Sequence, residues 1–473
     1  MFEHLKSSPS YRWFILANVS VGTFMSTLDA SIVNVALPTI AAKMQTSLAT
    51  LQWVITAYLL AISSLLPVFG RIADLIGRKR VYSMGFVVFT LGSVLCAFSQ
   101  NIWFLVGMRV LQAFGASMLM SNSSAIVTST FDPKERGRAL GMIGSVVALG
   151  SLAGPALGGI LIGLTGDWRW IFFINLPIGI IGYIAAWFIL PSDKPTRGNE
   201  SFDFGGATFF TLGMISLLLA VNNGEDWGWS SLPIIIGFIL GVVLLALFFF
   251  TELKVKHPMI HLSLFRNRPF LIGNLSGLLQ FTSMFGNNML LPFYLQHVLN
   301  LGPTYVGLLM TSFPVVMAIT APISGLASDR IGPVALTTGG LVCSALGMFY
   351  LAHVGADTSP WLVLPGPLLM GLGSGLFNSP NNSSVMSSVP RNKLGVAGGI
   401  NALVRNVGMV VGIAYSVSLF EALGGVNNPA KGQQVATFIS AYHTVMLTSM
   451  VIALIAAVIS LNRKGYATPE QGR

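Results

Sequence analysis

The segment GRIADLIG at residues 70–77 recurs as GLASDRIG at residues 325–332, with Gly, Asp and Gly at matching positions. Each copy follows an apolar stretch long enough to cross ~30 Å of hydrocarbon as a helix. The copies lie 255 residues apart, and at about 32 residues per helix and loop this distance corresponds to eight helices. The repeat therefore predicts two six-helix bundles with two additional helices between them.

The composition of the chain predicts an integral membrane protein. Of its 473 residues, 53% are hydrophobic and only 9% are charged. A soluble domain carries roughly a quarter of charged residues, so this chain has too few to cover a surface in water. The fold class predicted is an all-α polytopic membrane protein.

Fourteen apolar segments are predicted to cross the membrane as helices. They are residues 12–36, 50–70, 81–99, 101–125, 138–163, 168–190, 204–222, 232–251, 269–295, 303–327, 333–353, 360–387, 394–421 and 437–461. We expect residues 1–191 to form an N-terminal six-helix bundle, residues 192–256 two inserted helices, and residues 257–473 a C-terminal six-helix bundle with a cytoplasmic tail.

The basic residues predict the orientation of these helices. With the N-terminus in the cytoplasm, all but five of the 26 Lys and Arg residues fall in cytoplasmic segments. The five are Lys43, Arg169 and Lys431 on the outer side and Arg109 and Arg405 within helices. This is the positive-inside distribution, and it places both termini in the cytoplasm. It also accounts for the net charge of +10 without a nucleic-acid partner.

Seven motifs occur in a fixed order along the chain. They are LDASIVNVALP 28–38, GRIADLIGRKR 70–80, RVLQAFGAS 109–117, GSLAGPALGG 150–159, DWRWIFFINLPIG 167–179, GLGSGLFNSP 371–380 and GVAGGINALVRNVGMVVG 395–412. With them the chain resembles, over essentially its full length, the major facilitator superfamily, and within it the fourteen-helix drug:proton antiporters. The resemblance implies the major facilitator fold and proton-coupled efflux of small compounds across the plasma membrane by alternating access.

Asp29 is an acid inside the first apolar segment, where a charged group is costly and usually faces a cavity or a partner. It lies about 24 Å along its helix from the cytoplasmic start, and Arg109 lies about 12 Å along the fourth helix from the outer start. Both residues are therefore expected in the outer half of the membrane, close enough to interact. Two interpretations remain open: a permanent ion pair that locks two helices, or a carboxyl group that carries the coupled proton. The family resemblance implies the second.

The repeated segment predicts a cytoplasmic gate, formed by Gly70, Asp74, Gly77, Arg78 and, in the second copy, Asp329. Glycine permits close backbone approach and a tight turn. The resemblance implies that Asp74 meets the start of the fifth helix of the opposite bundle, near Gly395, and stabilises the outward-facing state. A basic loop that only sets topology is the alternative. In the second copy GRKR is replaced by GPVA after Gly332, which weakens the expectation of a symmetric gate.

The fifth helix carries small residues at four-residue spacing. Gly150, Gly154 and Gly158 allow close helix packing, and Pro155 removes one backbone hydrogen bond and permits a bend. Tight packing alone is one explanation of this pattern. The family resemblance implies instead that it is the antiporter motif and that transport is directed outward.

The substrate cavity is expected between the first and fourth helices of the two bundles. Amide and aromatic side chains on these helices are the candidate contacts: Asn34, Gln112, Asn122, Gln280, Phe281, Phe285, Asn288, Phe377, Asn378 and Asn381. Such surfaces suit amphipathic or weakly cationic molecules, although each residue is equally explained by helix packing. The absence of an acid from residues 306–325 favours neutral or singly charged substrates.

Other classes of protein lack support in the sequence. The chain has no Gly-Lys dipeptide, which excludes a Walker-type nucleotide loop, and no His-Glu-x-x-His or Gly-x-Ser-x-Gly motif of a membrane enzyme. We expect no enzymatic activity, no cofactor and no metal site. The expected partners are protons, a small-molecule substrate and the lipid bilayer, with the monomer as the functional form. The alternative function is proton-coupled export of a lipid or endogenous metabolite.

Overall fold

The computed structural model describes residues 10–132, 135–191, 204–254, 262–390, 394–426 and 433–463. Within these ranges the regular structure is entirely helical. Twelve of the helices there are long and apolar enough to cross a membrane. The shorter apolar stretch Gly205–Val221 and the more polar helix α12, Arg268–Phe293, occupy the two remaining positions expected from the sequence. The prediction of an all-α polytopic membrane protein is confirmed.

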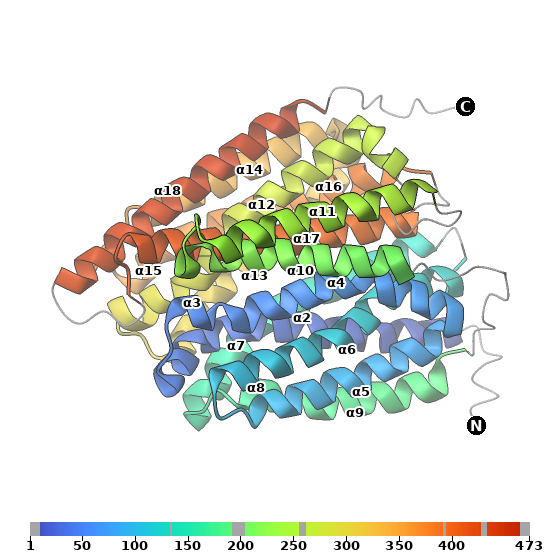
Figure 1. Cartoon of the computed structure of the whole chain (residues 1–473), viewed down its shortest axis with the longest axis horizontal. Coiled ribbons are helices and arrows are strands. Elements are labelled where there is room, and N and C mark those ends of the chain that lie inside the picture. The colour runs from blue at the N-terminus through green and yellow to red at the C-terminus, as the bar shows by residue number, and fades with distance from the viewer. Residues whose placement is uncertain are drawn as a thin grey trace. The chain divides into compact units, whose positions relative to one another are not determined.

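The chain divides into two compact units, and each is described by itself. Unit 1 contains Met1–Thr46, Trp53–Ile215 and Gly241–Met259, and unit 2 contains Ser47–Gln52, Ser216–Leu240 and Ile260–Arg473. The elements of both units are labelled in Figure 1.

Unit 1 is a bundle of long helices with one short helix. Its elements are α2 (Tyr11–Met44), α4 (Trp53–Ile76), α5 (Arg78–Ala97), α6 (Ile102–Thr130), α7 (Arg136–Thr165), α8 (Trp170–Phe173) and α9 (Asn175–Ile189). Helix α2 packs on α7, α4 and α5 both pack on α6, and α5 also packs on α9. This pairing brings α2, α5, α6 and α9 together in the interior of the unit.

Unit 2 repeats the same pairing with different helices. Its elements besides α12 are α3 (Leu48–Leu51), η1 (Leu262–Arg266), η2 (Tyr294–Val298), α13 (Pro303–Ile331), α14 (Pro333–Leu351), α15 (Pro360–Val363), α16 (Pro365–Ser387), α17 (Leu394–Ala422) and α18 (Gln433–Leu461). Helix α12 packs on α17, α13 and α14 both pack on α16, and α14 also packs on α18. Helices α12, α14, α16 and α18 therefore correspond to α2, α5, α6 and α9.

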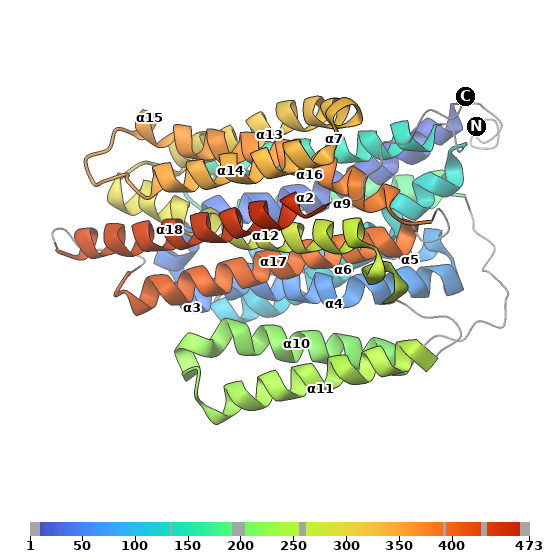
Figure 2. The ribbon, with the colours of Figure 1, turned by 90° about the horizontal axis from the view of Figure 1, so that it is seen from above.

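Helices α10 (Phe204–Trp227) and α11 (Leu232–Lys254) lie side by side as a pair (Figure 2). Oγ of Ser216 donates to the carbonyl of Gly237 at 2.9 Å, and the rings of Phe210 and Phe248 are 5.1 Å apart. The division into units cuts across both helices. That residues 192–256 form an inserted pair between bundles 1–191 and 257–473 stays a prediction.

The glycines that end the repeated segment have the same backbone role in both units. Gly77 lies between α4 and α5 with φ of 105°, and Gly332 lies between α13 and α14 with φ of 80°. Side chains rarely tolerate such angles, so glycine is required for the turn at each place. The close approach expected at Gly70 is not found, because an added Cβ would make only an ordinary 3.8 Å contact with Ser121.

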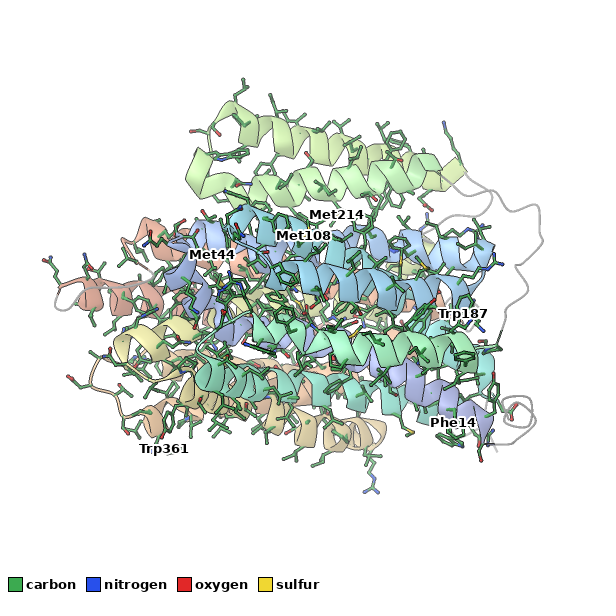
Figure 3. The ribbon with its side chains drawn as sticks, turned by 90° about the horizontal axis from the view of Figure 1, so that it is seen from below. Phe14, Met44, Met108, Trp187, Met214 and Trp361 are labelled. Atoms are coloured by element: carbon green, nitrogen blue, oxygen red, sulfur yellow. The ribbon has the colours of Figure 1, made fainter. Side chains whose placement is uncertain are left out.

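The outer faces of the helices are apolar. On α9, Ile180, Ile181 and Ile184 are all exposed, as expected for side chains that contact lipid. Aromatic side chains project near helix ends, including Phe14 and Trp187 at the end of unit 1 where α2 begins and α9 ends (Figure 3). Aromatic residues favour the membrane–water interface. These features are those of a multi-pass membrane protein.

Candidate functional site

Asp29 of α2 and Arg109 of α6 form an ion pair in the interior of unit 1. Nη1 of Arg109 lies 2.5 Å from Oδ2 of Asp29, and the exposed fractions of the two side chains are 1% and 0% respectively. The depth estimate from the sequence places these residues near each other, and the contact is direct. A buried charge is tolerated only where it is paired and hydrogen-bonded, so the neighbours of the pair determine what it can do.

Two amides complete the coordination of the Asp29 carboxylate. Its Oδ1 accepts hydrogen bonds from Nε2 of Gln112 at 2.8 Å and from Nδ2 of Asn175 at 3.0 Å. Nδ2 of Asn175 also donates to Oγ of Ser93 at 3.0 Å. Within the described part of the chain, Oδ1 of Asn175 is buried and accepts no hydrogen bond. The carboxylate thus receives donors from α6 and α9, while Asn175 keeps one unused acceptor beside it.

Arg109 is held by contacts in addition to Asp29. Its Nε donates to the carbonyl of Val54 at 3.1 Å, and its Nη1 also donates to Oε1 of Gln112 at 2.6 Å. The guanidinium carbon lies 3.9 Å from the ring centroid of Tyr58, which is a cation–π contact. Because Val54 and Tyr58 are both on α4, the ion pair links three helices, α2, α4 and α6.

Each oxygen of the Asp29 carboxylate has its own partners. In the paired arrangement Oδ2 of Asp29 faces Arg109 and Oδ1 accepts two amide donors. All hydrogen bonds described for the Asp29 carboxylate thus come from one guanidinium and two amides.

Sequence reasoning missed three members of this network: Ser93, Asn175 and Tyr58. Asn175 lies within the quoted motif DWRWIFFINLPIG, and an amide in an apolar span is itself a signal of a buried polar contact. Ser93 and Tyr58 carry no comparable signal, because serine and tyrosine are common inside membrane helices. Among the described residues, no group of three or more His, Cys, Asp or Glu side chains could hold a metal ion.

The small residues of α7 pack directly on the helix that carries Asp29. A Cβ added at Gly150 would collide with Oγ1 of Thr27, and one added at Gly154 would collide with Oγ of Ser31. At Gly158 an added Cβ would lie 2.8 Å from a side-chain carbon of Ile32 and 3.0 Å from its carbonyl. These three positions thus require glycine for the contact between α7 and α2.

Two further observations concern the same contact. Oγ of Ser31 donates to the carbonyl of Gly150 at 3.1 Å, which joins α2 to α7 by a polar bond within the apolar interface. Pro155 lies inside α7 and is buried, between the glycines that contact α2. Because proline removes one backbone hydrogen bond, α7 has a built-in weak point beside the segment of α2 that carries Asp29.

Half of the predicted substrate-contact residues are buried with partners inside their own unit. In unit 1, Gln112 belongs to the Asp29 network, and Asn122 donates to the carbonyl of Met118 at 2.8 Å within its own helix. In unit 2, Gln280 donates to Oγ of Ser344 at 3.2 Å.

The two remaining buried members also lie in unit 2. Phe377 packs with Leu341 and Ala456 in a buried apolar cluster. Oδ1 of Asn381 accepts a hydrogen bond from Arg463. Each of these five side chains therefore has at least one partner within its bundle, as the packing interpretation of the sequence allows.

The other five predicted substrate-contact residues keep part of their surface exposed: Asn34, Phe281, Phe285, Asn288 and Asn378. Phe281 and Phe285 lie four residues apart on α12, with ring centroids 6.5 Å apart. These side chains are the better candidates for contact with a substrate.

The predicted gate is described only in part. Asp74 and Asp329 lie in α4 and α13, but their side chains are outside the described residues. Nη1 of Arg78 donates to the carbonyl of Ala125 at 3.4 Å, which ties the start of α5 to α6. The gate itself stays a prediction.

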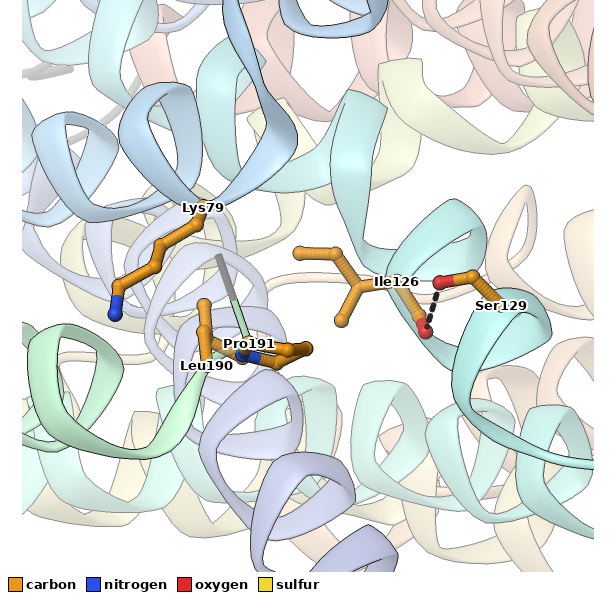
Figure 4. A pocket seen from close by; sticks show the side chains of 5 residues that line it. All are labelled: Lys79, Ile126, Ser129, Leu190 and Pro191. Carbon is orange, nitrogen blue, oxygen red and sulfur yellow. Dashed lines mark hydrogen bonds between the residues drawn. The ribbon is translucent and has the colours of Figure 1, made fainter. Parts of the chain in front are cut away.

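A small recess opens in unit 1 where α5 begins and α6 and α9 end (Figure 4). It is lined by Lys79, Ile126, Ser129, Leu190 and Pro191. Oγ of Ser129 donates to the carbonyl of Ile126 at 2.9 Å. The lining contains no carboxyl group and none of the predicted site residues, so the Asp29 network remains the candidate site.

Known proteins of similar sequence are membrane transporters. A family model described as Major Facilitator Superfamily matches residues 19–413 and, in a second match, residues 274–469. The riboflavin transporter RibZ of Clostridioides difficile is 37% identical over 454 residues, which are 96% of this chain and 98% of that protein. The multidrug transporter protein MdtP of Bacillus subtilis is 31% identical over 417 residues, which are 88% of this chain and 76% of that protein.

A solved structure has a similar fold. It is a bacterial homolog of the human lysosomal transporter Spinster, matched with a TM-score of 0.67 over 97% of this chain and 98% of that one. The sequence identity is 16%, so this likeness concerns the fold alone.

Proposed function

The chain belongs to the major facilitator superfamily of membrane transporters, and from this premise we propose that it is a proton-coupled multidrug efflux antiporter. It exports amphipathic compounds that are neutral or singly cationic. The observation that carries the proposal is the ion pair of Asp29 and Arg109, which is fully buried among membrane helices. An ionisable residue inside a membrane segment is a functional candidate by default.

The proposed coupling step exchanges a proton for the contact with Arg109. When Arg109 withdraws toward its other partners, Val54 and Tyr58, the Asp29 carboxylate loses its counter-charge and takes up a proton from the outer side. When the pair re-forms, the proton is released toward the cytoplasm. Asp29 fits the role because a carboxyl group exists in charged and neutral forms, whereas arginine stays charged.

Asn175 supports both charge states of Asp29. With the carboxylate ionised, the amide donates from Nδ2 to Oδ1. With the carboxyl group protonated, a rotated amide presents its Oδ1, the acceptor without a partner in the described part of the chain, to the new O–H. The Asn175 amide can therefore form a hydrogen bond with either the ionised or the protonated form of Asp29, so no polar atom of Asp29 loses its partner when the charge changes.

Helix α7 connects the proton site to the movement of the bundle. Its glycines contact α2 at Thr27 and Ser31, on either side of Asp29 in the sequence. A bend at Pro155 would change this contact and with it the position of the carboxyl group. By family resemblance this contact is the antiporter motif, which favours export over uptake.

The rest of the proposed cycle follows the family. Gly70, Asp74, Gly77, Arg78 and Asp329 form the cytoplasmic gate, and the substrate cavity includes the partly exposed Phe281 and Phe285. The protein acts as a monomer in the plasma membrane, with both termini in the cytoplasm.

A metabolite is the second candidate substrate, and a specific observation favours it. The relative that aligns over nearly the whole length of both chains is named a riboflavin transporter. A planar, polar heteroaromatic compound of that kind would suit aromatic faces with nearby amides, such as Phe281, Phe285 and Asn288. On this alternative the coupling step at Asp29 is the same and only the cargo differs.

The test uses inverted membrane vesicles that contain the protein, with an imposed proton gradient. Uptake of a fluorescent lipophilic cation and of riboflavin is measured for wild type and for Asp29→Asn at matched expression. Met284→Leu serves as the control, because it changes a buried residue of unit 2 without changing a charge. We expect wild type to accumulate the cation only while the gradient persists, and Asp29→Asn to fall to the level of empty vesicles.

The outcomes separate the two candidates. Gradient-driven uptake of riboflavin without uptake of the cations supports the metabolite transporter. Unchanged gradient-driven uptake by Asp29→Asn contradicts the assigned role of Asp29.

A further inference from the structure

Arg463 is a buried cation at the end of unit 2 where α18 terminates. Its side chain is 1% exposed, although it follows the last residue of α18, Leu461, by only two positions. One hydrogen bond is formed, from Nη2 to Oδ1 of Asn381. Among the described residues, Nε and Nη1 of Arg463 have no acceptor. A guanidinium group can donate five hydrogen bonds, so most of its capacity is unused.

The surroundings form a cradle with donors and no acid. A Cβ added at Gly273 of α12 would collide with Cγ2 of Val385 and would lie 3.4 Å from Nη2 of Arg463 and from Oδ1 of Asn381, so the guanidinium and the amide lie close to α12. Ser384 lies one turn after Asn381 on α16 and is 1% exposed. Its Oγ has no hydrogen-bond partner among the described residues. No ion pair joins Arg463 to an Asp or Glu side chain of the described chain.

The described residues provide no counter-charge for Arg463. Burial lowers the pKa of the Arg463 guanidinium to about 10, so the group remains protonated at neutral pH. A buried charge without a partner destabilises the folded state. A ligand that supplies negative oxygen atoms would remove this cost.

The position of the cradle points to the membrane surface. On the predicted orientation, α12 begins and α16 and α18 end at the cytoplasmic side. Nδ2 of Asn267 donates to the carbonyl of Ser388 at 2.6 Å, which holds the start of α12 beside the end of α16. The adjacent Arg266 and Arg268 are exposed and add positive charge at this end. Basic pockets between membrane helices on the cytoplasmic side bind anionic lipid headgroups.

We propose that Arg463, Asn381 and Ser384 form a binding site for a phosphate group at the end of unit 2 where α12 begins and α16 and α18 end. The planar guanidinium matches the geometry of phosphate oxygens, and the amide and hydroxyl groups supply further donors. The headgroup of an anionic phospholipid in the cytoplasmic leaflet is one source of that phosphate, and soluble phosphate is the other. This site is independent of the Asp29 network and of the transported substrate.

The experiment measures thermal unfolding of the purified full-length protein in a nonionic detergent by tryptophan fluorescence. Phosphatidylglycerol, phosphatidylcholine and inorganic phosphate are titrated separately against wild type, Arg463→Gln and Arg330→Gln. Arg330 is an exposed arginine at the end of α13, so its variant controls for the loss of one positive charge. A ligand that binds only the folded state stabilises it, and we expect phosphatidylglycerol to raise Tm by roughly 2–5 °C in wild type and Arg330→Gln but not in Arg463→Gln.

The three additives distinguish the sources of phosphate. A shift with phospholipid alone identifies a headgroup, and a shift with inorganic phosphate alone identifies a soluble ligand. A shift that persists in Arg463→Gln, or no shift with any additive, overturns the proposal.

A second variant tests the charge argument without removing the arginine. Asn381→Asp places a carboxylate against Arg463 and should supply the missing counter-charge from within the protein. We expect Asn381→Asp to have a higher Tm than wild type without additive and no response to phosphatidylglycerol. A lower Tm with an unchanged lipid response contradicts the proposal.

Discussion

The interiors of the two units pair their helices in the same way but differ in chemical character. In unit 1, the interior of α2 and α6 holds Asp29 and Arg109 as a charged pair. In unit 2, the corresponding helices α12 and α16 hold a neutral cluster, in which Sδ of Met284 accepts hydrogen bonds from Nε2 of Gln280 and Oγ of Ser374, each at 3.0 Å. Because the two copies of the repeated segment lie 255 residues apart, the position in unit 2 that corresponds to Asp29 is Met284.

The packing between helices is conserved between the units while the centres differ. On α17 a Cβ added at Gly408 would lie 2.6 Å from the carbonyl of Leu278, and one at Gly412 would collide with the carbonyl of Thr282. These glycines contact α12 as Gly150 and Gly154 contact α2. Close helix approach is therefore common to both units, whereas unit 1 has the ionisable Asp29 where unit 2 has the neutral Met284. The comparison favours unit 1 as the place to test for proton chemistry.

The largest expected effect is on the stability of the charged centre. Arg109→Met leaves Asp29 buried without its cation, and removing one partner of a buried pair costs about 3–5 kcal/mol. The double variant Asp29→Asn/Arg109→Met removes both charges and should recover most of that loss. Denaturant unfolding in detergent measures both.

In unit 2 the matched variant is Met284→Leu, which removes no charge. If Arg109→Met unfolds with the same midpoint as Met284→Leu, the two centres do not differ in the way proposed.

A smaller effect is expected at Asn175. Asn175→Leu removes one donor to the Asp29 carboxylate, and a hydrogen bond to a charged group is worth roughly 1.5–3 kcal/mol. Asn122→Leu is the control, because that amide donates to Met118 and Ser121 of its own helix. Equal losses of unfolding free energy in the two variants would remove Asn175 from the functional network.

The contact between α7 and α2 is the next test. Gly154→Ala places a Cβ against Ser31, and such overpacking costs about 1–3 kcal/mol. Gly144→Ala on the same helix is the control, since nothing lies within 4 Å of the added carbon. We expect Gly154→Ala to lower both Tm and the transport rate. Wild-type transport by Gly154→Ala would show that the close packing of α7 on α2 is not needed for coupling.

The smallest effect is expected in the neutral centre of unit 2. Met284→Leu keeps the volume and removes a weak acceptor, so the loss of stability should be below about 1.5 kcal/mol. Proton-driven uptake by Met284→Leu in inverted vesicles should match that of wild type. A loss of coupling comparable to that of Asp29→Asn would show that proton chemistry is shared by the two units.

The fold and the charged pair follow from the sequence because both rest on strong local signals. The length of each apolar segment locates a membrane helix. Asp29 and Arg109 are conspicuous because each is a charged residue within an apolar segment, and both are expected at a similar depth in the membrane. Helix α2 extends to Met44, eight residues past its predicted end, because Pro38 lies inside the helix instead of ending it. Membrane helices tolerate proline where neighbouring groups satisfy the freed backbone.

The remaining members of the site depend on three-dimensional packing. Asn175 reaches Asp29 only because α9 packs on α5 and α2, a relation that no local pattern encodes. Phe377 and Gln280 look like cavity residues in the sequence, yet each is buried among partners of its own bundle. Polar and aromatic residues in membrane helices serve packing and binding equally, so composition cannot distinguish these uses.

The most direct test of the account is whether substrate binding moves a proton on or off Asp29. Purified wild type and Asp29→Asn, in weakly buffered detergent with a pH indicator, are mixed with a substrate that the vesicle assay has identified. The account predicts proton release by wild type when substrate binds and none by Asp29→Asn, with substrate binding itself retained. Equal proton release by the two proteins would contradict the assignment of Asp29 as the coupling residue.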